Sequence, residues 1–126
     1  MAVYGIGIDL IRTDRIQQML SRWNDRFLKR VFTEGEQRVC SARKTPARCY
    51  ALRFAAKEAF VKALGRGMRP PVLWLDIEVI NNALGKPEIV LSRRAELFCG
   101  EQGIRARHLS LTDDGDYGAA MVVLES

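Results

Sequence analysis

The chain has 126 residues, of which 48% are hydrophobic and 28% are charged, and this composition fits one compact domain over residues 1–126. It has no apolar run near the roughly 20 residues of a membrane-spanning helix, and it lacks the basic start and apolar stretch of a signal peptide. Its three cysteines have no C-x-x-C spacing, so we expect neither a disulfide framework nor a zinc knuckle, and a reducing cytoplasm fits best.

The net charge of +5 favours anionic partners, such as nucleic acid, phosphate-bearing cofactors, acidic proteins or anionic membranes. Basic residues are concentrated near the N-terminus, at Arg12, Arg15, Arg22, Arg26, Lys29 and Arg30. The last four arginines are separated by seven, four and four positions, which can align them along a helix. A charge run of this kind is usually a solvated face, but Met19 within it indicates an adaptable contact surface.

Residues 3–10 alternate in the manner of a β-strand. One face carries Tyr4, Ile6, Ile8 and Leu10, and the other carries Val3, Gly5, Gly7 and Asp9. Because the two glycines lack side chains, another element can approach this second face closely. The alternative is a strand that is weakened by glycine and contains a bulge.

Helical patterns follow this strand. Thr13 is expected to cap a first helix, and residues 25–30 are expected to form a short second one. Thr33 and Glu36 have the spacing of a capping box, which predicts a helix over residues 34–42.

A longer helix is predicted from Pro46, which suits a first turn, to Leu64, with Gly65 as its stop. Its apolar stripe is formed by Leu52, Ala56, Ala59, Phe60 and Ala63. Several of these residues are small, so a neighbouring element can pack close to this helix.

The second half of the chain predicts mostly strands. Residues 72–80 and 88–91 have the pattern of a hairpin, Ser92 is expected to cap a helix, and residues 107–112 and 117–124 form a final hairpin. This order of elements predicts an α+β fold in which helices pack on a mostly antiparallel sheet.

Two acidic residues from distant segments are the main candidates for a site. Asp9 ends the first strand and Glu58 lies in the long helix, so both meet at one edge of the core if strand and helix pack together. Buried carboxylates need an opposite charge, which Mg²⁺ with a phosphate ligand supplies. Lys62 shares a helix face with Glu58 and can neutralise another phosphate oxygen. The alternatives are an exposed Glu58–Lys62 ion pair and an Asp9 that caps the following turn.

His108 is the only histidine of the chain. In an alternating strand it shares a polar face with Ser110 and Thr112, where it can bind a ligand. The alternative is a structural or simply exposed histidine.

Six segments form a combined pattern in order along the chain: residues 5–11, 53–59, 62–68, 76–79, 85–87 and 108–111. This pattern resembles the bacterial holo-acyl-carrier-protein synthases over nearly the whole chain. The resemblance implies a 4′-phosphopantetheinyl transferase-like fold and transfer of the 4′-phosphopantetheine group of coenzyme A to a serine of apo acyl carrier protein. It also implies release of 3′,5′-ADP, dependence on Mg²⁺, and a homotrimer with each site between two subunits.

The resemblance further implies roles for individual residues. Asp9 and Glu58 would hold Mg²⁺ against the diphosphate of coenzyme A, and Glu58 and Lys62 would be catalytic. The acceptor of the serine proton stays open between Glu58 and a water on the metal. The implied coenzyme A-binding residues are Lys44, Arg53, Lys62, Gly65 and His108, with Lys44 and Arg53 near the 3′-phosphate.

The implied docking surface for the acidic carrier protein consists of Arg15, Met19, Arg26 and Arg30. Two positions depart from the family pattern. Arg66 stands where many members have threonine, which leaves the contacts of this loop to coenzyme A open, and Asp113 stands where some members have histidine.

Two other interpretations stay open. The charge supports a small basic nucleic-acid-binding module, but no helix-turn-helix, zinc finger or RNA-binding aromatic motif is present, so we expect neither a nucleic-acid nor a membrane partner. A carrier-binding subunit without catalysis would bind carrier protein without changing its mass.

Overall fold

One long helix, α3 (Pro46–Leu64), lies at the centre of the α+β fold in this computed structural model, which describes residues 1–126. The other elements are β1 (Val3–Arg12), α1 (Thr13–Val31), α2 (Glu34–Ser41), η1 (Trp74–Asp76), β2 (Ile77–Asn81), β3 (Pro87–Leu91), α4 (Arg93–Glu101), β4 (Ala106–Asp114) and β5 (Tyr117–Glu125). The strands form two antiparallel sheets, β1-β5-β4 and β2-β3, where a single sheet was predicted.

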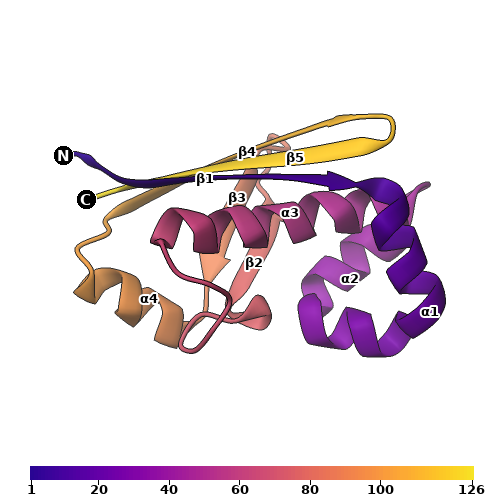
Figure 1. Cartoon of the computed structure of the whole chain (residues 1–126), viewed down its shortest axis with the longest axis horizontal. Coiled ribbons are helices and arrows are strands. Elements are labelled where there is room, and N and C mark those ends of the chain that lie inside the picture. The colour runs from indigo at the N-terminus through magenta and orange to yellow at the C-terminus, as the bar shows by residue number, and fades with distance from the viewer.

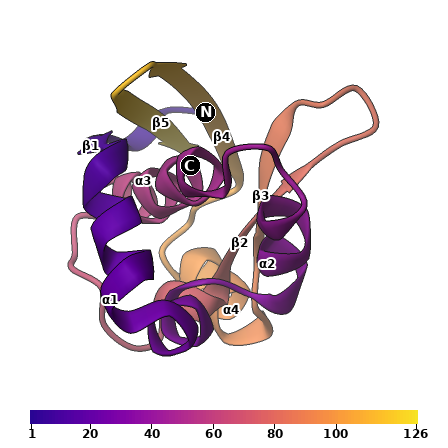
Figure 2. The same cartoon turned by 90° about the vertical axis from the view of Figure 1, so that its right-hand side faces the viewer.

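The three-stranded sheet covers one side of α3, and α1 and α2 lie together near the N-terminal end of that helix (Figure 1). The second sheet is a hairpin that starts within the body of the molecule and whose turn projects from it (Figure 2). The two chain ends lie close to each other at one end of the sheet, where Ser126 N–H donates to Ala2 O at 2.8 Å. None of the helices combines the length and apolarity needed to span a membrane.

β1 packs on α3 through its glycine face, as predicted. A Cβ atom at Gly5 would collide with the carbonyl oxygen of Ala63, and one at Gly7 would collide with that of Ala59. Only glycine therefore allows this close approach of strand and helix. The pairing of β1 with β5 also shifts register between Val3 and Gly5. An irregularity of the kind expected under the alternative interpretation, a strand with a bulge, is therefore present as well.

The opposite face of β1 is uncovered in the single chain. Ile6, Ile8 and Leu10 are 62%, 64% and 66% exposed. Met121 of β5 pairs with Ile8 and is 44% exposed on the same face. A contiguous apolar strip of this kind is typical of a surface that binds another protein.

The local helix signals are mostly confirmed. Thr33 and Glu36 form both hydrogen bonds of a capping box, Gly65 ends α3 with a φ of 79°, and the Ser92 side chain accepts from Ala95 N–H. The prediction for Thr13 is wrong, because it is the first residue of α1 and the cap position belongs to Arg12. The predicted break before residue 25 is a kink at Asn24 within α1.

The strand predicted over residues 72–80 is wrong in its first part. Trp74–Asp76 form the short helix η1, closed by Asp76 N–H donating to Leu73 O and by Leu73 N–H donating to the Asp76 carboxylate, each at 2.9 Å. The buried Lys57 Nζ also donates to Trp74 O at 3.0 Å. The two local hydrogen bonds and the one from α3 hold the segment out of the strand that its apolar alternation indicated.

No disulfide framework was expected from the cysteine spacing, yet one disulfide is present. Cys40 in the last turn of α2 and Cys49 in the first turn of α3 form a disulfide, whereas Cys99 is free and buried. The turn between the two helices brings their Cα atoms to 5.3 Å, which is within the range that a disulfide spans. Sequence spacing alone does not reveal this proximity.

Candidate functional site

Asp9 of β1 and Glu58 of α3 lie on the same side of α3, because β1 runs along this helix. Lys62, one turn beyond Glu58, donates its Nζ to Asp9 Oδ1 at 3.1 Å and to Ile8 O at 3.0 Å. Its side chain is 51% exposed, so the amine can reorient toward a ligand. The alternative pairing of Lys62 with Glu58 is not formed.

Glu58 lies in an environment that disfavours its negative charge. Burial raises the pKa of its carboxyl and the nearby Asp9 charge raises that pKa further, while Lys62 and Arg15 lower it. Lys62 contacts Asp9 and not Glu58, so the Glu58 carboxylate has no counter-charge in direct contact.

Such an oxygen-rich, electronegative site fits a hard dication such as Mg²⁺. The chain places no third His, Cys, Asp or Glu with this pair, since it contains no group of three or more such side chains arranged for a metal. A cation held by Asp9 and Glu58 would therefore take its remaining ligands from water or from a bound substrate.

Gly65 and Arg66 follow the C-terminal end of α3, close in sequence to Lys62. Gly65 has no side chain and leaves this corner open. The side chain of Arg66 is half-buried, its Nη2 donates to Pro70 O at 2.7 Å, and its guanidinium lies 4.6 Å from the Phe98 ring centre. The residue that departs from the family pattern is thus occupied by contacts within its own loop and with α4.

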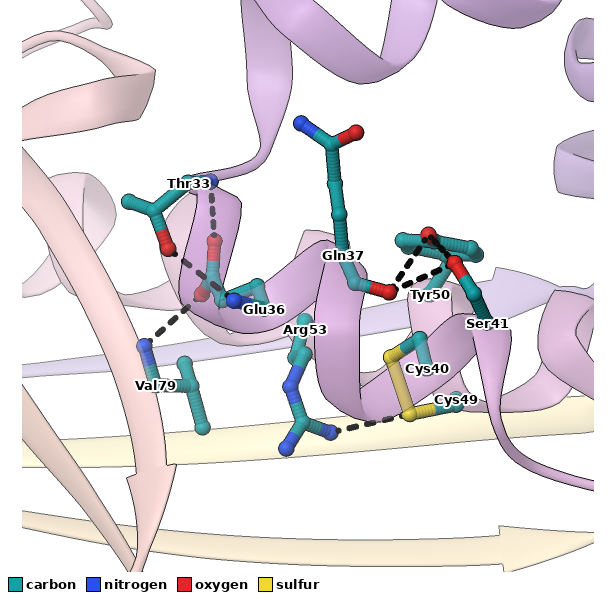
Figure 3. The surroundings of a disulfide bond; sticks show 9 residues. All are labelled: Thr33, Glu36, Gln37, Cys40, Ser41, Cys49, Tyr50, Arg53 and Val79. Carbon is teal, nitrogen blue, oxygen red and sulfur yellow. Dashed lines mark hydrogen bonds between the residues drawn. A yellow bond between two sulfur atoms is a disulfide. The ribbon is translucent and has the colours of Figure 1, made fainter.

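Arg53 lies half a helical circumference from Lys62, on the side of α3 that faces α2 and β2. It is only 4% exposed, its Nη1 donates to Cys49 Sγ at 3.2 Å, and its Nε has no hydrogen-bond partner (Figure 3). Burial lowers the pKa of Arg53, and Glu36 partly compensates. Arg53 lines a pocket of about 310 Å³ together with Arg43 and Arg48. A basic pocket with an unsatisfied guanidinium suits a phosphate group.

Lys44 is exposed on the turn between α2 and α3. It lines a neighbouring pocket, also of about 310 Å³, with Thr13 and Arg48. Asp113, to which no role was assigned, lines the Arg53 pocket and forms an ion pair with Arg48 at 3.5 Å.

His108 lies on the exposed face of β4, as its strand pattern predicted. Its Nε2 is 2.6 Å from Glu125 Oε1, and it lines a pocket of about 500 Å³ between β3 and β4 with Arg105 and Arg107. Pro87 lines this pocket and the Arg53 pocket as well, so the two are adjacent.

The expected site residues therefore fall into two groups within one chain. Asp9, Glu58 and Lys62 form one group, and they line neither the His108 pocket nor the Arg53 pocket. Arg53 and His108 line those two adjacent pockets, and Lys44 lines the third.

All four expected docking residues lie on α1. Arg15, Arg26 and Arg30 are exposed, and Met19 is partly buried against the core. Arg15 lies close enough to Glu58 for its charge to lower that residue's pKa. Arg30 lines a pocket of about 380 Å³ beside Trp74.

Sequence reasoning missed several residues near these surfaces. Trp23 is 43% exposed on α1, and the guanidinium groups of Arg22 and Arg26 lie 5.5 Å and 5.7 Å from its ring centre. Its position between two arginines was the available signal. Arg43 and Arg48 were visible as basic residues, but only the fold shows that they share a pocket with Arg53.

Comparison with known proteins gives a consistent result over the full chain. Residues 5–122 match the family model described as the 4′-phosphopantetheinyl transferase superfamily. The holo-[acyl-carrier-protein] synthase of Geobacter sp. (strain M21) is 48% identical over 123 residues, which cover 98% of both chains.

Solved structures agree with this match. The crystal structure of holo-[acyl-carrier-protein] synthase from Neisseria meningitidis has a TM-score of 0.94 at 37% identity, covering 98% of this chain and 99% of that chain. The enzyme from Bacillus anthracis str. Ames in complex with CoA (3′,5′-ADP) has a TM-score of 0.83 at 39% identity, covering 100% and 99%. The chain therefore belongs to the 4′-phosphopantetheinyl transferase superfamily, among the holo-[acyl-carrier-protein] synthases, and is a transferase.

Proposed function

We propose that this protein transfers the 4′-phosphopantetheine group of coenzyme A to a serine of apo acyl carrier protein and releases 3′,5′-ADP. The observation that carries the proposal is the cluster of Asp9, Glu58 and Lys62, which β1 and α3 bring together in a chain whose full-length relatives are holo-[acyl-carrier-protein] synthases. The serine oxygen bonds to the β-phosphorus of coenzyme A, and the bond from that phosphorus to the bridging oxygen breaks.

Asp9 and Glu58 are the residues that would hold Mg²⁺, which supplies positive charge to the diphosphate oxygens when bound. Lys62 exchanges its contact with Asp9 for a diphosphate oxygen and stabilises the charge that develops as 3′,5′-ADP leaves. We assign acceptance of the serine proton to Glu58, directly or through water.

The second group of residues binds the nucleotide half of coenzyme A. The buried guanidinium of Arg53 and the exposed Lys44 are assigned to the 3′-phosphate, and His108 to the adjacent nucleotide pocket. Gly65 leaves room for the substrate beside Lys62 because it carries no side chain.

The two groups combine into complete sites if copies of the chain assemble. The exposed strip of Ile6, Ile8, Leu10 and Met121 supplies an apolar face for that contact, and we assign it to a homotrimer with sites between subunits. Sedimentation analysis tests this assignment, since a trimer has three times the chain mass of 14.3 kDa.

Arg15, Met19, Arg26 and Arg30 on α1 form the docking surface for the acidic carrier protein, because complementary charge speeds encounter. The compartment that we assign to this reaction is the cytoplasm, which cell fractionation tests.

The central experiment is incubation of the protein with coenzyme A, Mg²⁺ and apo carrier protein, followed by mass spectrometry of the carrier. A mass gain of one phosphopantetheine group on a serine is the expected result. Carrier binding without a mass gain would instead support a subunit without catalysis. Nucleic-acid binding with a steep salt dependence, and no transfer, would support the basic module.

A further inference from the structure

The Cys40–Cys49 disulfide joins α2 to α3 (Figure 3), and the arginines of the basic pocket around Arg53 lie on α3 and on the turn that precedes it. Cys40 is fully buried at the end of α2, whereas Cys49 is partly exposed and lines the pocket itself. The turn between the two cysteines carries Arg43 and Lys44. The disulfide therefore closes a short loop, residues 40–49, that contains these two basic residues.

Arg53 is coupled to the same bond. It lies one helical turn after Cys49, and its Nη1 donates to Cys49 Sγ at 3.2 Å. Sulfur is a weak acceptor, and the Nε of Arg53 is buried without a partner. The disulfide thus takes part in holding a guanidinium whose hydrogen-bonding capacity is incompletely used.

We propose that Cys40 and Cys49 form a redox-sensitive site that tunes nucleotide affinity, with the oxidised form binding the 3′-phosphate of coenzyme A more tightly. The inference rests on the proposed function, which assigns this phosphate to Arg53 and Lys44. The disulfide restricts the conformations of the 40–49 loop in the free protein, so this loop loses less conformational freedom when the ligand binds. Disulfides in cytoplasmic proteins are characteristically transient or redox-sensing, which fits a reversible bond here.

The chemistry proceeds by thiol–disulfide exchange at the accessible sulfur. A thiolate of a dithiol reductant attacks Cys49 Sγ, and Cys40 leaves as a thiolate and takes up a proton. The second thiolate of the reductant attacks the mixed disulfide and releases Cys49 as a thiol. The protein gains two electrons and two protons, and the reductant becomes a cyclic disulfide. Nearby guanidinium groups stabilise the leaving Cys49 thiolate.

Isothermal titration of the full-length protein with coenzyme A and with dephospho-coenzyme A tests the inference. One sample is oxidised with glutathione disulfide and the other is reduced with dithiothreitol. Reduction is expected to weaken coenzyme A binding about three- to tenfold and to leave binding of dephospho-coenzyme A unchanged. The reason is that the 3′-phosphate, which dephospho-coenzyme A lacks, is the only group assigned to the residues of the disulfide-closed loop and Arg53. The same loss is expected for Cys49→Ser without any reductant.

Cys99→Ala is the matched control, since this cysteine is buried on α4 away from the pocket, and it should keep the full redox response. Equal affinity of both redox forms for coenzyme A would overturn this inference alone. So would a non-reducing peptide map of the oxidised protein without a Cys40–Cys49 link. No binding of coenzyme A by either form would overturn the proposed function, and this inference with it.

Discussion

Lys57 and Glu58 are consecutive residues of α3, yet their surroundings differ completely. Lys57 is fully buried, and its Nζ donates to Val31 O at 2.6 Å, Glu36 Oε1 at 2.7 Å and Trp74 O at 3.0 Å. These contacts use all three donors of the ammonium group. Burial lowers the pKa of Lys57, and the Glu36 charge opposes that shift.

Glu58 has no such set of partners. It forms no ion pair within the chain, it lies beside the like charge of Asp9, and its pKa is raised by burial first and by Asp9 second. The difference teaches that a charge with all its hydrogen bonds satisfied holds the fold together, whereas an unsatisfied charge is available to a ligand. The predictions below test this division between structural and functional charges.

Lys57→Met should cause the largest effect on stability. It leaves the Glu36 carboxylate buried without its counter-charge, and loss of one partner of a buried pair costs about 3–5 kcal/mol. Urea unfolding of the variant measures this loss. The double variant Lys57→Met/Glu36→Gln should recover part of the stability, because it no longer buries a lone charge. An unfolding midpoint equal to that of the unaltered protein would contradict the structural role of Lys57.

Glu58→Gln should do the opposite, reducing transfer while leaving the fold intact. We expect at least about a hundredfold slower phosphopantetheine transfer, because the variant removes a charged oxygen donor that is also a candidate base. Its stability should be unchanged or slightly higher, since the repulsion with Asp9 disappears. The measurement is the rate of carrier mass gain with Mg²⁺ present, with Glu101→Gln on α4 as a matched control. Near-normal turnover would remove Glu58 from the site.

Asp76 provides a second satisfied charge for comparison with Glu58. Its burial would raise the pKa, but hydrogen bonds from Arg94, Ser92 and Leu73 N–H outweigh burial and lower the pKa to about 2. The stability that these bonds contribute is on the order of 2 kcal/mol, is complete above pH about 4, and is lost as the pH falls toward 2. The stability difference between the unaltered protein and Asp76→Asn should therefore shrink between pH 6 and pH 2.5. If this stability difference stayed constant over the range, the charge of Asp76 would not be its source.

Arg15→Glu should produce the smallest effect, confined to the carrier protein. Unlike Arg94, which is bound to Asp76, Arg15 is exposed and forms no ion pair within the chain. The substitution should raise the KM for carrier protein about tenfold and leave coenzyme A affinity unchanged. Arg93→Glu makes the same charge change on α4, outside the four docking residues, and should have no effect. Equal loss of carrier and coenzyme A binding would indicate misfolding of the variant instead.

Prediction from sequence was most successful where a short segment contains all the necessary interactions. The side chains of Thr33 and Ser92 accept hydrogen bonds from the backbone N–H groups of Glu36 and Ala95. The positive φ of Gly65 needs no contact with a distant segment. Asp9, Glu58 and Lys62 could be proposed as a cluster because the glycine face of the first strand predicted its close packing on the helix. The pairing of Lys62 with Asp9, rather than with Glu58, depends on the register of that packing.

The sequence by itself determined the kind of most elements and their ends, because capping and turn formation act over a few neighbouring residues. Only the tertiary structure decided that the apolar face of β1 opposite the glycines stays exposed, that Trp74–Asp76 form a short helix, and that Cys40 meets Cys49. It also decided that the hydrogen bonds of Lys57 are satisfied, because its acceptors come from α1, α2 and η1. Glu58 instead faces the like charge of Asp9 on β1, and all these elements are separate from α3 in the sequence. Non-local packing supplies these contacts, and local spacing contains no information about them.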